Sequence, residues 1–309
     1  MNISALKKRP AVFNSLTGIN PQEFDLLYDK FKSVFYLEYT SKLKNRSDRK
    51  RAFGAGRHTD IGDVQDMLVF ILFYVKAYPL QFVQGLVFDI AESSANYWIH
   101  VLMPILEKTL EKTYSIPKRG KNVAEILKLF PELREIGILV DGTERPKRKP
   151  KNTAKRKTQY SGKKKRHTVK NIVIAKPIDK RVLYLGETYD GSIHDKTCVE
   201  KDAIQFNGKG NNKIPIGGDL GFEGVNISGA TLALPYKKPK GEELTELQKA
   251  QNTQFSKIRV EIENAICGVK RSRIVSDVFR NTKEGFDDLV MNVSVGLHNF
   301  RVTNRFEVS

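Results

Sequence analysis

The feature that most constrains the fold is a change in hydrophobic periodicity near Pro131. Before it, from about residue 20 to 112, apolar residues recur at helical spacing, as in Phe24 and Leu27 after the helix-initiating Pro21. After it, short apolar runs are bounded by turn residues, which is typical of strands. The chain therefore predicts a small all-α region followed by a region that contains a sheet.

A pair of helices in the first region has the pattern of a helix-turn-helix. One short helix is predicted over Leu80–Phe88, and a second begins at Ser93 or Ser94 after a tight turn and ends at Leu106. If the pair binds DNA, Ser94–His100 lies at the end that faces the groove. Ordinary bundle packing produces the same pattern, so both interpretations stay open on this evidence.

The second region predicts a mixed sheet with helices on its faces, an α/β arrangement. It begins with three strands, and helices and strands alternate after them. The predicted elements are strands at Ile136–Val140, His167–Ala175 and Arg181–Thr188, a helix near Asp195–Gln205, strands at Pro215–Gly217 and Thr231–Tyr236, and a long helix from Glu243 to about Arg273.

Two aspartates come directly after predicted strands, where ligands gather in α/β sheets. Asp141 follows the run IGILV, and Asp219 follows IPIGG. Two carboxylates held together repel each other, and a divalent cation between them is the usual reason to keep both ionised. Each aspartate alone has a simpler interpretation, because an acid at a strand end often caps the next turn.

A third acid can come from the long helix, where Glu261 and Glu263 flank the apolar stripe on opposite sides. Periodicity alone leaves the choice between them open. Arg259, Glu263 and Lys270 fall on one line of the helix, which gives Glu263 cationic neighbours. The apolar stripe itself consists of Ile258, Ile262, Ala265, Ile266 and Val269.

The charge of the chain points to a polyanionic partner. The sequence holds 53 basic and 35 acidic residues, a net charge of +18, and thirteen of the basic residues lie without any acid between Arg145 and Lys170. Such a concentration beside Asp141 favours contact with a DNA backbone, with an affinity that falls steeply as salt rises. A solvated loop has the same composition and is the alternative.

Nothing in the sequence predicts a membrane segment or a secretory signal. The longest apolar run, Met67–Val75, is far shorter than the roughly 20 residues that span a bilayer, and no apolar segment follows the basic N-terminal residues. We therefore expect a cytoplasmic protein that does not contact membranes. Cys198 and Cys267 are expected to be reduced and structural.

Several motifs together resemble the DDE-type transposases of bacterial insertion sequences, in the branch shared with Harbinger-like elements. The resemblance covers about residues 136–301, and the N-terminal half also resembles the helix-turn-helix domain of this branch. The motifs are VDGTE at 140–144, YSGKKKRHTVKN at 160–171, GSIHDK at 191–196, GGDLGF at 217–222, LPYKKP at 234–239, RVEIENAICGVKRSRI at 259–274 and LHNFR at 297–301.

The resemblance implies three parts of the chain and a ribonuclease-H-like catalytic fold, a mixed sheet with flanking helices. Residues 1–115 would form the helix-turn-helix domain, 116–135 a linker and lead-in, and 136–309 the DDE catalytic domain. The family's tyrosine three positions before the helix arginine is absent, because Ser256 stands there.

The resemblance assigns Asp141, Asp219 and Glu263 as catalytic, metal-binding residues. In the family the glutamate lies four positions after an arginine and seven before a lysine, as Glu263 does relative to Arg259 and Lys270. Asp195 is the alternative to Asp219 as the second metal ligand. We expect Asp195 and His194 to lie near the metals and to orient the ligands without binding the metals themselves. The expected DNA-binding residues are Lys147, Arg148, Lys149, Lys163, Lys164, Lys165, Arg166, Arg259 and Lys270.

The expected chemistry is cleavage and joining of phosphodiester bonds with two Mg²⁺ ions, for which Mn²⁺ can substitute. Asp141 would be shared by both ions, with Asp219 and Glu263 completing one site each. The expected partners are double-stranded DNA, as element ends and target, and a second copy in a homodimer or higher oligomer; in a bacterium the protein would associate with the nucleoid. The alternatives are an endonuclease without strand transfer and a catalytically silent DNA-binding protein.

Overall fold

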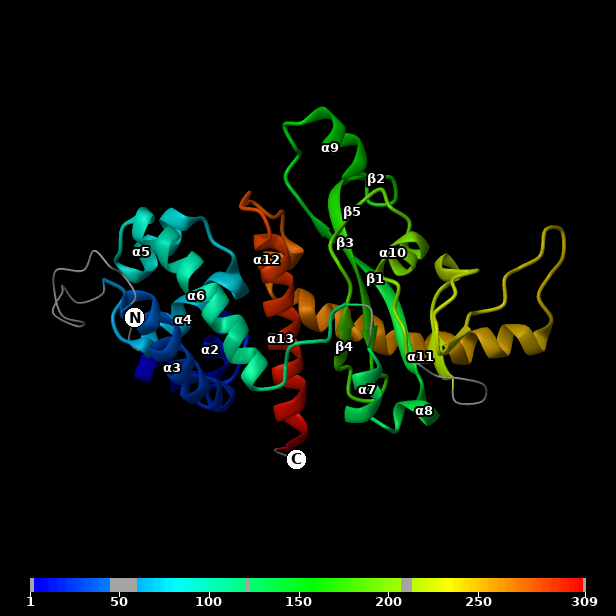
Figure 1. The fold of residues 1–309 in the computed structure, drawn as a ribbon, viewed down its shortest axis with the longest axis horizontal. Helices are drawn as coiled ribbons and strands as arrows, with labels where there is room; N and C mark the ends of the chain where they lie inside the picture. Colours follow the sequence, from blue (N-terminus) through cyan, green and yellow to red (C-terminus); the bar gives the residue numbers. More distant parts are fainter. Residues whose placement is uncertain (1–2, 45–59, 121–122, 207–212, 308–309) are drawn as a thin grey trace. The chain divides into compact units, whose positions relative to one another are not determined.

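The computed structural model describes residues 3–44, 60–120, 123–206 and 213–307 of the chain. These residues form two compact units, coloured along the sequence in Figure 1. The first takes the described residues of Met1–Ile116, Lys270–Asp277 and Thr282–Ser309, and the second takes those of Pro117–Val269 and Val278–Asn281. The chain thus leaves the first unit, builds the second and returns, while the boundaries of functional domains stay a prediction.

The first unit is helical, as the periodicity of its N-terminal part predicts. Its central helix α4 is buried on nearly every side, and Asp63 caps it by accepting the N–H groups of Gln65 and Asp66 at 2.8 and 2.9 Å. No helix in the described ranges is both long and apolar enough to cross a membrane. The helices are α1 (Ile3–Lys7), α2 (Pro10–Thr17), α3 (Pro21–Lys44), α4 (Val64–Ala77), α5 (Gln81–Phe88), α6 (Glu92–Lys112), α12 (Arg273–Ser276) and α13 (Phe286–Glu307).

The last helix completes the core of this unit. Asn292 of α13 donates to Glu107 at 2.7 Å, and Asn299 donates to the carbonyl of Ser115 at 2.8 Å. Between them Gly296 allows close approach, since a Cβ there would lie 2.7 Å from the side chain of Ile116. Residues about 180 positions apart in the sequence are therefore needed together to form one helical unit.

Helices α5 and α6 form the predicted helix pair. The turn between them is tight at Gly85, where a Cβ would lie 2.5 Å from the carbonyl oxygen of Ile90. The buried Gln84 donates to the carbonyl of Phe70 at 2.9 Å and so ties α5 to α4. The second helix begins at Glu92 and ends at Lys112, so it continues about two turns beyond its predicted end at Leu106.

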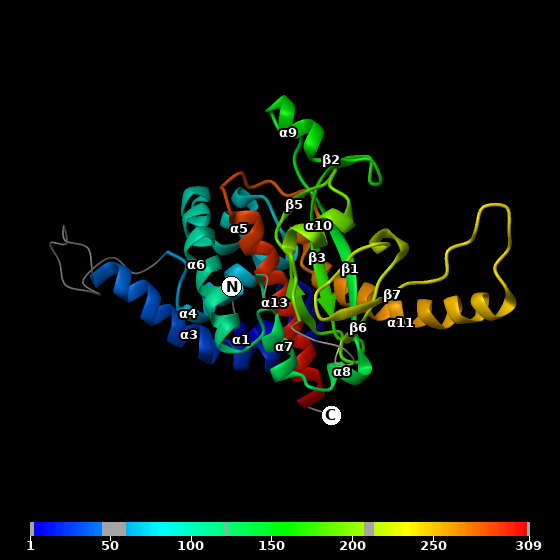
Figure 2. The same ribbon diagram turned by 45° about the vertical axis from the view of Figure 1, so that its right-hand side comes forward.

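The second unit is a mixed sheet with helices on both faces (Figure 2). Its main strand order is β2-β3-β1-β6-β7, and β4 and β5 both pair with β3. Strand β1 is antiparallel to β3 and parallel to β6, which is parallel to β7. This confirms the mixed α/β sheet expected for a ribonuclease-H-like fold. The strands are β1 (Ile138–Pro146), β2 (Tyr160–Ser161), β3 (Arg166–Ala175), β4 (Val182–Leu185), β5 (Tyr189–Asp190), β6 (Ile214–Gly217) and β7 (Ala230–Ala233).

Short helices connect the strands, and one long helix follows them. The short ones are α7 (Ala124–Leu129), α8 (Leu133–Ile136), α9 (Thr153–Thr158), α10 (Asp195–Asp202) and the 3-10 turn η2 (Leu220–Phe222). The long helix α11 (Glu246–Lys270) is slightly shorter at both ends than the predicted helix.

Strand β1 differs from its prediction in a way that matters for Asp141. The apolar run IGILV predicted a strand ending at Val140, whereas β1 continues to Pro146 because β3 pairs with it along the whole length. Pairing with β6 on the other edge stops at Leu139, which lies opposite Gly217. Asp141 is thus inside a strand but beyond the carboxyl end of the neighbouring parallel strand.

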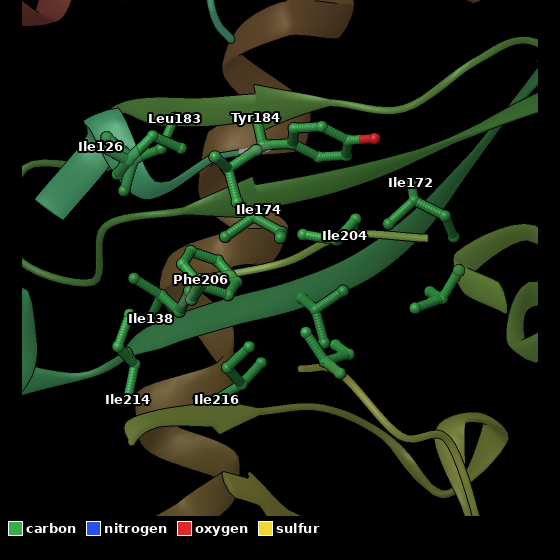
Figure 3. Packing of buried hydrophobic residues seen from close by; sticks show 14 of the residues in the cluster. Ile126, Ile138, Ile172, Ile174, Leu183, Tyr184, Ile204, Phe206, Ile214 and Ile216 are labelled. Atoms are coloured by element: carbon green, nitrogen blue, oxygen red, sulfur yellow. The ribbon is translucent and has the colours of Figure 1, made fainter. Parts of the chain in front are cut away.

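The apolar core of the sheet lies mainly on one face (Figure 3). Alternation along β1 sends Val140 to this face and Leu139 to the other. On that other face Leu139 and Phe255 of α11 both approach Gly217, where a Cβ would meet them at 2.9 and 3.3 Å. The core face includes Ile138, Val140, Ile172, Ile174, Leu183, Tyr184, Cys198, Val199, Phe206, Ile214 and Ile216.

Candidate active site

Asp141 and Asp219 follow the paired residues of two neighbouring parallel strands, β1 and β6. Both lie at the carboxyl end of this pairing. The last residues paired between β1 and β6 are Leu139 and Gly217, and each aspartate follows two positions later. Parallel strands bring such residues to one end, which is where α/β sheets place their ligands. The structure therefore brings these two predicted carboxylates into one electrostatic environment.

The environment of Asp141 disfavours its charge. Its pKa is raised to about 6, chiefly by burial, and the negative charges of Asp219 and Asp195 act in the same direction. The N–H of Gly142, which donates to Oδ1 at 2.8 Å, and the positive charge of Arg259 oppose the rise. A buried carboxylate kept beside like charges is the situation that a bound cation relieves.

Asp219 also caps the turn that follows it. Its Oδ1 accepts the N–H of Gly221 at 2.9 Å, at the first turn of η2. The simple capping interpretation of a strand-end acid thus holds for one oxygen of this residue. The cap fixes the orientation of the carboxylate, which is a useful property in a ligand as well.

The two glutamates of α11 have different surroundings. Glu261 lies 3.5 Å from Lys180 Nζ, whereas Glu263 is 56% exposed and its nearest ionic neighbour is Arg259 at 3.9 Å. Within the described ranges no three acidic, histidine or cysteine side chains lie close enough to hold a metal ion together. Asp141 and Asp219 are therefore brought together, and Glu263 is not gathered with them.

His194 and Asp195 begin α10, on the core side of the sheet. His194 is the cap of this helix, and its Nδ1 accepts the N–H of Lys196 at 3.4 Å. The carboxyl group of Asp195 lies against Gly142, where a Cβ would be 2.8 Å from its Cγ. Because alternate residues of a strand point to opposite faces, Asp195 lies across β1 from the Asp141 carboxylate.

Lys170 is a buried cation that the sequence analysis did not single out. Its Nζ lies 3.0 Å from Asp195 and 3.6 Å from Glu144, and Thr168 donates to the same glutamate at 2.9 Å. The signal was available, since Lys170 alternates with Ile172 and so points toward the core. Only 6% of the residue is exposed, so this charge belongs to the interior.

Most of the predicted DNA-binding cations lie on the surface between β1 and β3, around α9. Two of the thirteen basic residues of this stretch are internal: Lys170, and Arg145, whose Nη2 donates to Asn171 at 2.9 Å and Thr188 at 3.1 Å. The sequence therefore overstated the charge available to a partner. Arg148, Lys149, Lys163, Lys164, Lys165 and Arg166 are exposed, whereas Lys147, Arg259 and Lys270 are half-buried.

Comparison with known proteins finds matches along most of the chain. The model of a family described as DDE superfamily endonuclease matches residues 140–299, and one described as helix-turn-helix of DDE superfamily endonuclease matches residues 61–112. Over 290 residues the chain is 25% identical to the "Probable transposase for insertion sequence element IS702" of Microchaete diplosiphon, covering 94% of each chain. No solved structure matches the chain.

Proposed function

Because the chain belongs to the DDE superfamily endonucleases, whose family model matches just over half of it, we propose that it cuts DNA at the ends of a mobile element and joins the freed strands to a target. The matches confirm the resemblance to insertion-sequence transposases and the helix-turn-helix in the first unit. The proposal concerns the chemistry, the metal and the residues that carry them.

The observation that carries the proposal is the pair Asp141 and Asp219. The two carboxylates lie at the carboxyl end of paired parallel strands, and the pKa of Asp141 is raised to about 6 by burial and by its neighbours. Mg²⁺ prefers such oxygen-rich, negatively charged surroundings. Glu263, one helical turn beyond Arg259, is proposed as the third ligand. Two Mg²⁺ or Mn²⁺ ions held by these residues would supply the positive charge needed to activate the attacking oxygen and to stabilise the leaving one.

The remaining groups bind and orient the DNA. Arg259, whose charge acts on Asp141, is proposed to contact a phosphate oxygen beside the acids. The exposed cations around α9 are proposed to hold the DNA backbone, which fixes its position without selecting its sequence. Both ends of an element have to be held at once, so we expect a dimer or higher oligomer on DNA.

The test is cleavage and joining by the full-length protein with Mg²⁺ or Mn²⁺ and linear DNA that carries the element's ends. We expect nicks at the ends and joined products with a second DNA, both lost in Asp141→Asn. Glu200→Gln, which changes an exposed acid of α10, is the matched control and should keep both activities.

Each other outcome selects an alternative. Nicking without joined products would indicate an endonuclease that does not transfer strands. Binding with no cleavage under either metal, in the wild type and both variants, would indicate a DNA-binding protein without catalysis.

A further inference from the structure

The exposed face of α6 carries a stripe of polar side chains near its N-terminus. Its members follow helical spacing i, i+3, i+4 and i+7, and they are polar or aromatic rather than fully charged. Of these side chain types, the amide of asparagine is one that pairs with a base edge through two hydrogen bonds. The stripe consists of Ser93, Asn96, Tyr97 and His100, and the opposite, buried face consists of Ala95, Trp98, Ile99 and Leu102.

One residue of the stripe is joined to the preceding helix. The Nδ2 of Asn96 donates to the Oε1 of Gln81, the first residue of α5, at 3.0 Å. The close turn at Gly85 brings the start of α5 beside the second turn of α6. Within the part of the chain that the structure describes, this is the one side-chain hydrogen bond of either amide.

The hydrogen bond leaves an acceptor on one amide and a donor on the other available to a ligand. Asn96 keeps its Oδ1 as an acceptor, and Gln81 keeps its Nε2 as a donor. In the major groove adenine presents an acceptor, N7, beside a donor, N6, whereas guanine presents two acceptors. Thymine presents one acceptor beside a methyl group, and cytosine presents a donor alone. One donor beside one acceptor therefore matches adenine.

We infer that Asn96 and Gln81 act as one unit that recognises an adenine in the major groove of the DNA to which this protein binds. The inference rests on the proposed function for its DNA partner, but it concerns base recognition and not cleavage. Because the two amides are already held together, less side-chain freedom is lost on binding than with two separate amides.

The experiment begins with the full-length protein and a library of random duplexes, from which the preferred sequence is selected. Each adenine of that sequence is then replaced by 7-deazaadenine, which lacks the N7 acceptor, and by purine, which lacks the N6 amino group. At one adenine we expect both replacements to weaken binding of the wild type by roughly tenfold.

The variants Asn96→Ala and Gln81→Ala identify the protein partner. Both should bind the unmodified duplex roughly tenfold more weakly and should no longer distinguish adenine from its two analogues at that position. Gln22→Ala, an exposed amide on α3, is the control and should behave as the wild type does. Circular dichroism confirms that each variant folds.

The inference is overturned if Asn96→Ala selects the same sequence and keeps the same sensitivity to both analogues, or if the wild type selects no sequence. These failures are distinct from failure of the proposed function. Metal-dependent cleavage of linear DNA that persists while no adenine is recognised leaves the enzyme standing and removes only the base contact.

Discussion

The acidic side chains on the two faces of strand β1 differ in whether a positive charge balances them. On the core side, Glu144 and Asp195 share the buried Lys170, and the distances of 3.6 and 3.0 Å make an internal ion cluster. On the other side, the pKa of Asp141 is raised by burial and by the negative charge of Asp219. Two acids of a single strand, Asp141 and Glu144, thus belong to an unsatisfied cluster and a satisfied one.

The difference separates structural from functional acids. A buried charge with a partner is consistent with a role in the fold, and removal of its partner is costly. A buried carboxylate left beside like charges lowers stability unless something else binds there, which is typical of functional sites. We therefore expect Asp195, which is paired with Lys170, to serve the fold, and Asp141 with its neighbour Asp219 to serve the chemistry.

The largest effect on cleavage is expected when Asp219 and Asp195 are substituted separately and compared. Asp219→Asn should lower cleavage by about 10³-fold, because a metal ligand is lost, without loss of stability. Asp195→Asn should lower stability and should reduce cleavage far less. Cleavage rates and thermal unfolding of both variants check this, and a larger loss of cleavage in Asp195→Asn would reverse the comparison.

Removal of the cation of the satisfied cluster should destabilise the protein strongly. Lys170→Met leaves two partly buried carboxylates, of Glu144 and Asp195, without their buried partner, and we expect a loss of about 3 kcal/mol. Urea unfolding measures it, with Lys163→Met on the exposed loop as the control. Equal stability of the two variants would mean that the cluster contributes nothing.

The choice between the two helix acids sharpens the functional side. Glu263→Gln should lower cleavage by about 100-fold, equivalent to roughly 2.7 kcal/mol in the barrier, and should leave unfolding unchanged because the side chain is exposed. Glu261→Gln removes only the ion pair with Lys180 and should change cleavage by less than about threefold. The reverse order would assign the third ligand to Glu261.

The close contact of Asp195 with the core face of β1 can be tested at Gly142. An added methyl group would collide with the carboxyl group of Asp195, so Gly142→Ala should cost about 2 kcal/mol. The double variant with Asp195→Ala should recover part of this loss, which a double-mutant cycle measures. Strict additivity of the two changes would contradict the contact.

The smallest effect concerns the pH dependence of stability without metal. With its folded pKa raised to about 6 from an ordinary 3.8, Asp141 retains a proton that the unfolded chain has lost, so stability falls as pH rises between those values. Asp141→Asn should therefore be more stable than the wild type by on the order of 2 kcal/mol above pH 6, and equal to it below pH 4. Thermal unfolding in EDTA across pH tests the sign.

Local patterns predicted most of the fold. Helical periodicity located α3 to α6, and the strand-like runs located β1, β3 and β4 within a few residues. The predicted end of β1 was wrong, because β3 pairs with polar residues such as Glu144 and so continues the strand beyond Val140. Hydrophobic periodicity detects buried apolar residues, whereas the buried residues in this part of β1, such as Thr143 and Arg145, are polar.

The candidate site was predictable only in part. The position of Asp141 and Asp219 after two apolar runs was enough to bring them together, since the parallel pairing of these runs stops two residues before each aspartate. The ion cluster of Lys170 was missed because it depends on which residue of β3 lies opposite Glu144, a register that no local pattern gives. The role of Glu263 still rests on the family's spacing and stays a prediction.

The return of the chain to its first unit has a consequence during synthesis. Helices α1 to α6 leave the ribosome first, but α13, which supplies Asn292 and Asn299 to their core, follows only after the whole sheet has been made. At ordinary elongation rates that interval is roughly 10 to 30 s. We expect the nascent helix-turn-helix unit to stay incompletely folded until then, so that the newly made protein gains its DNA-binding surface only once the catalytic segment exists.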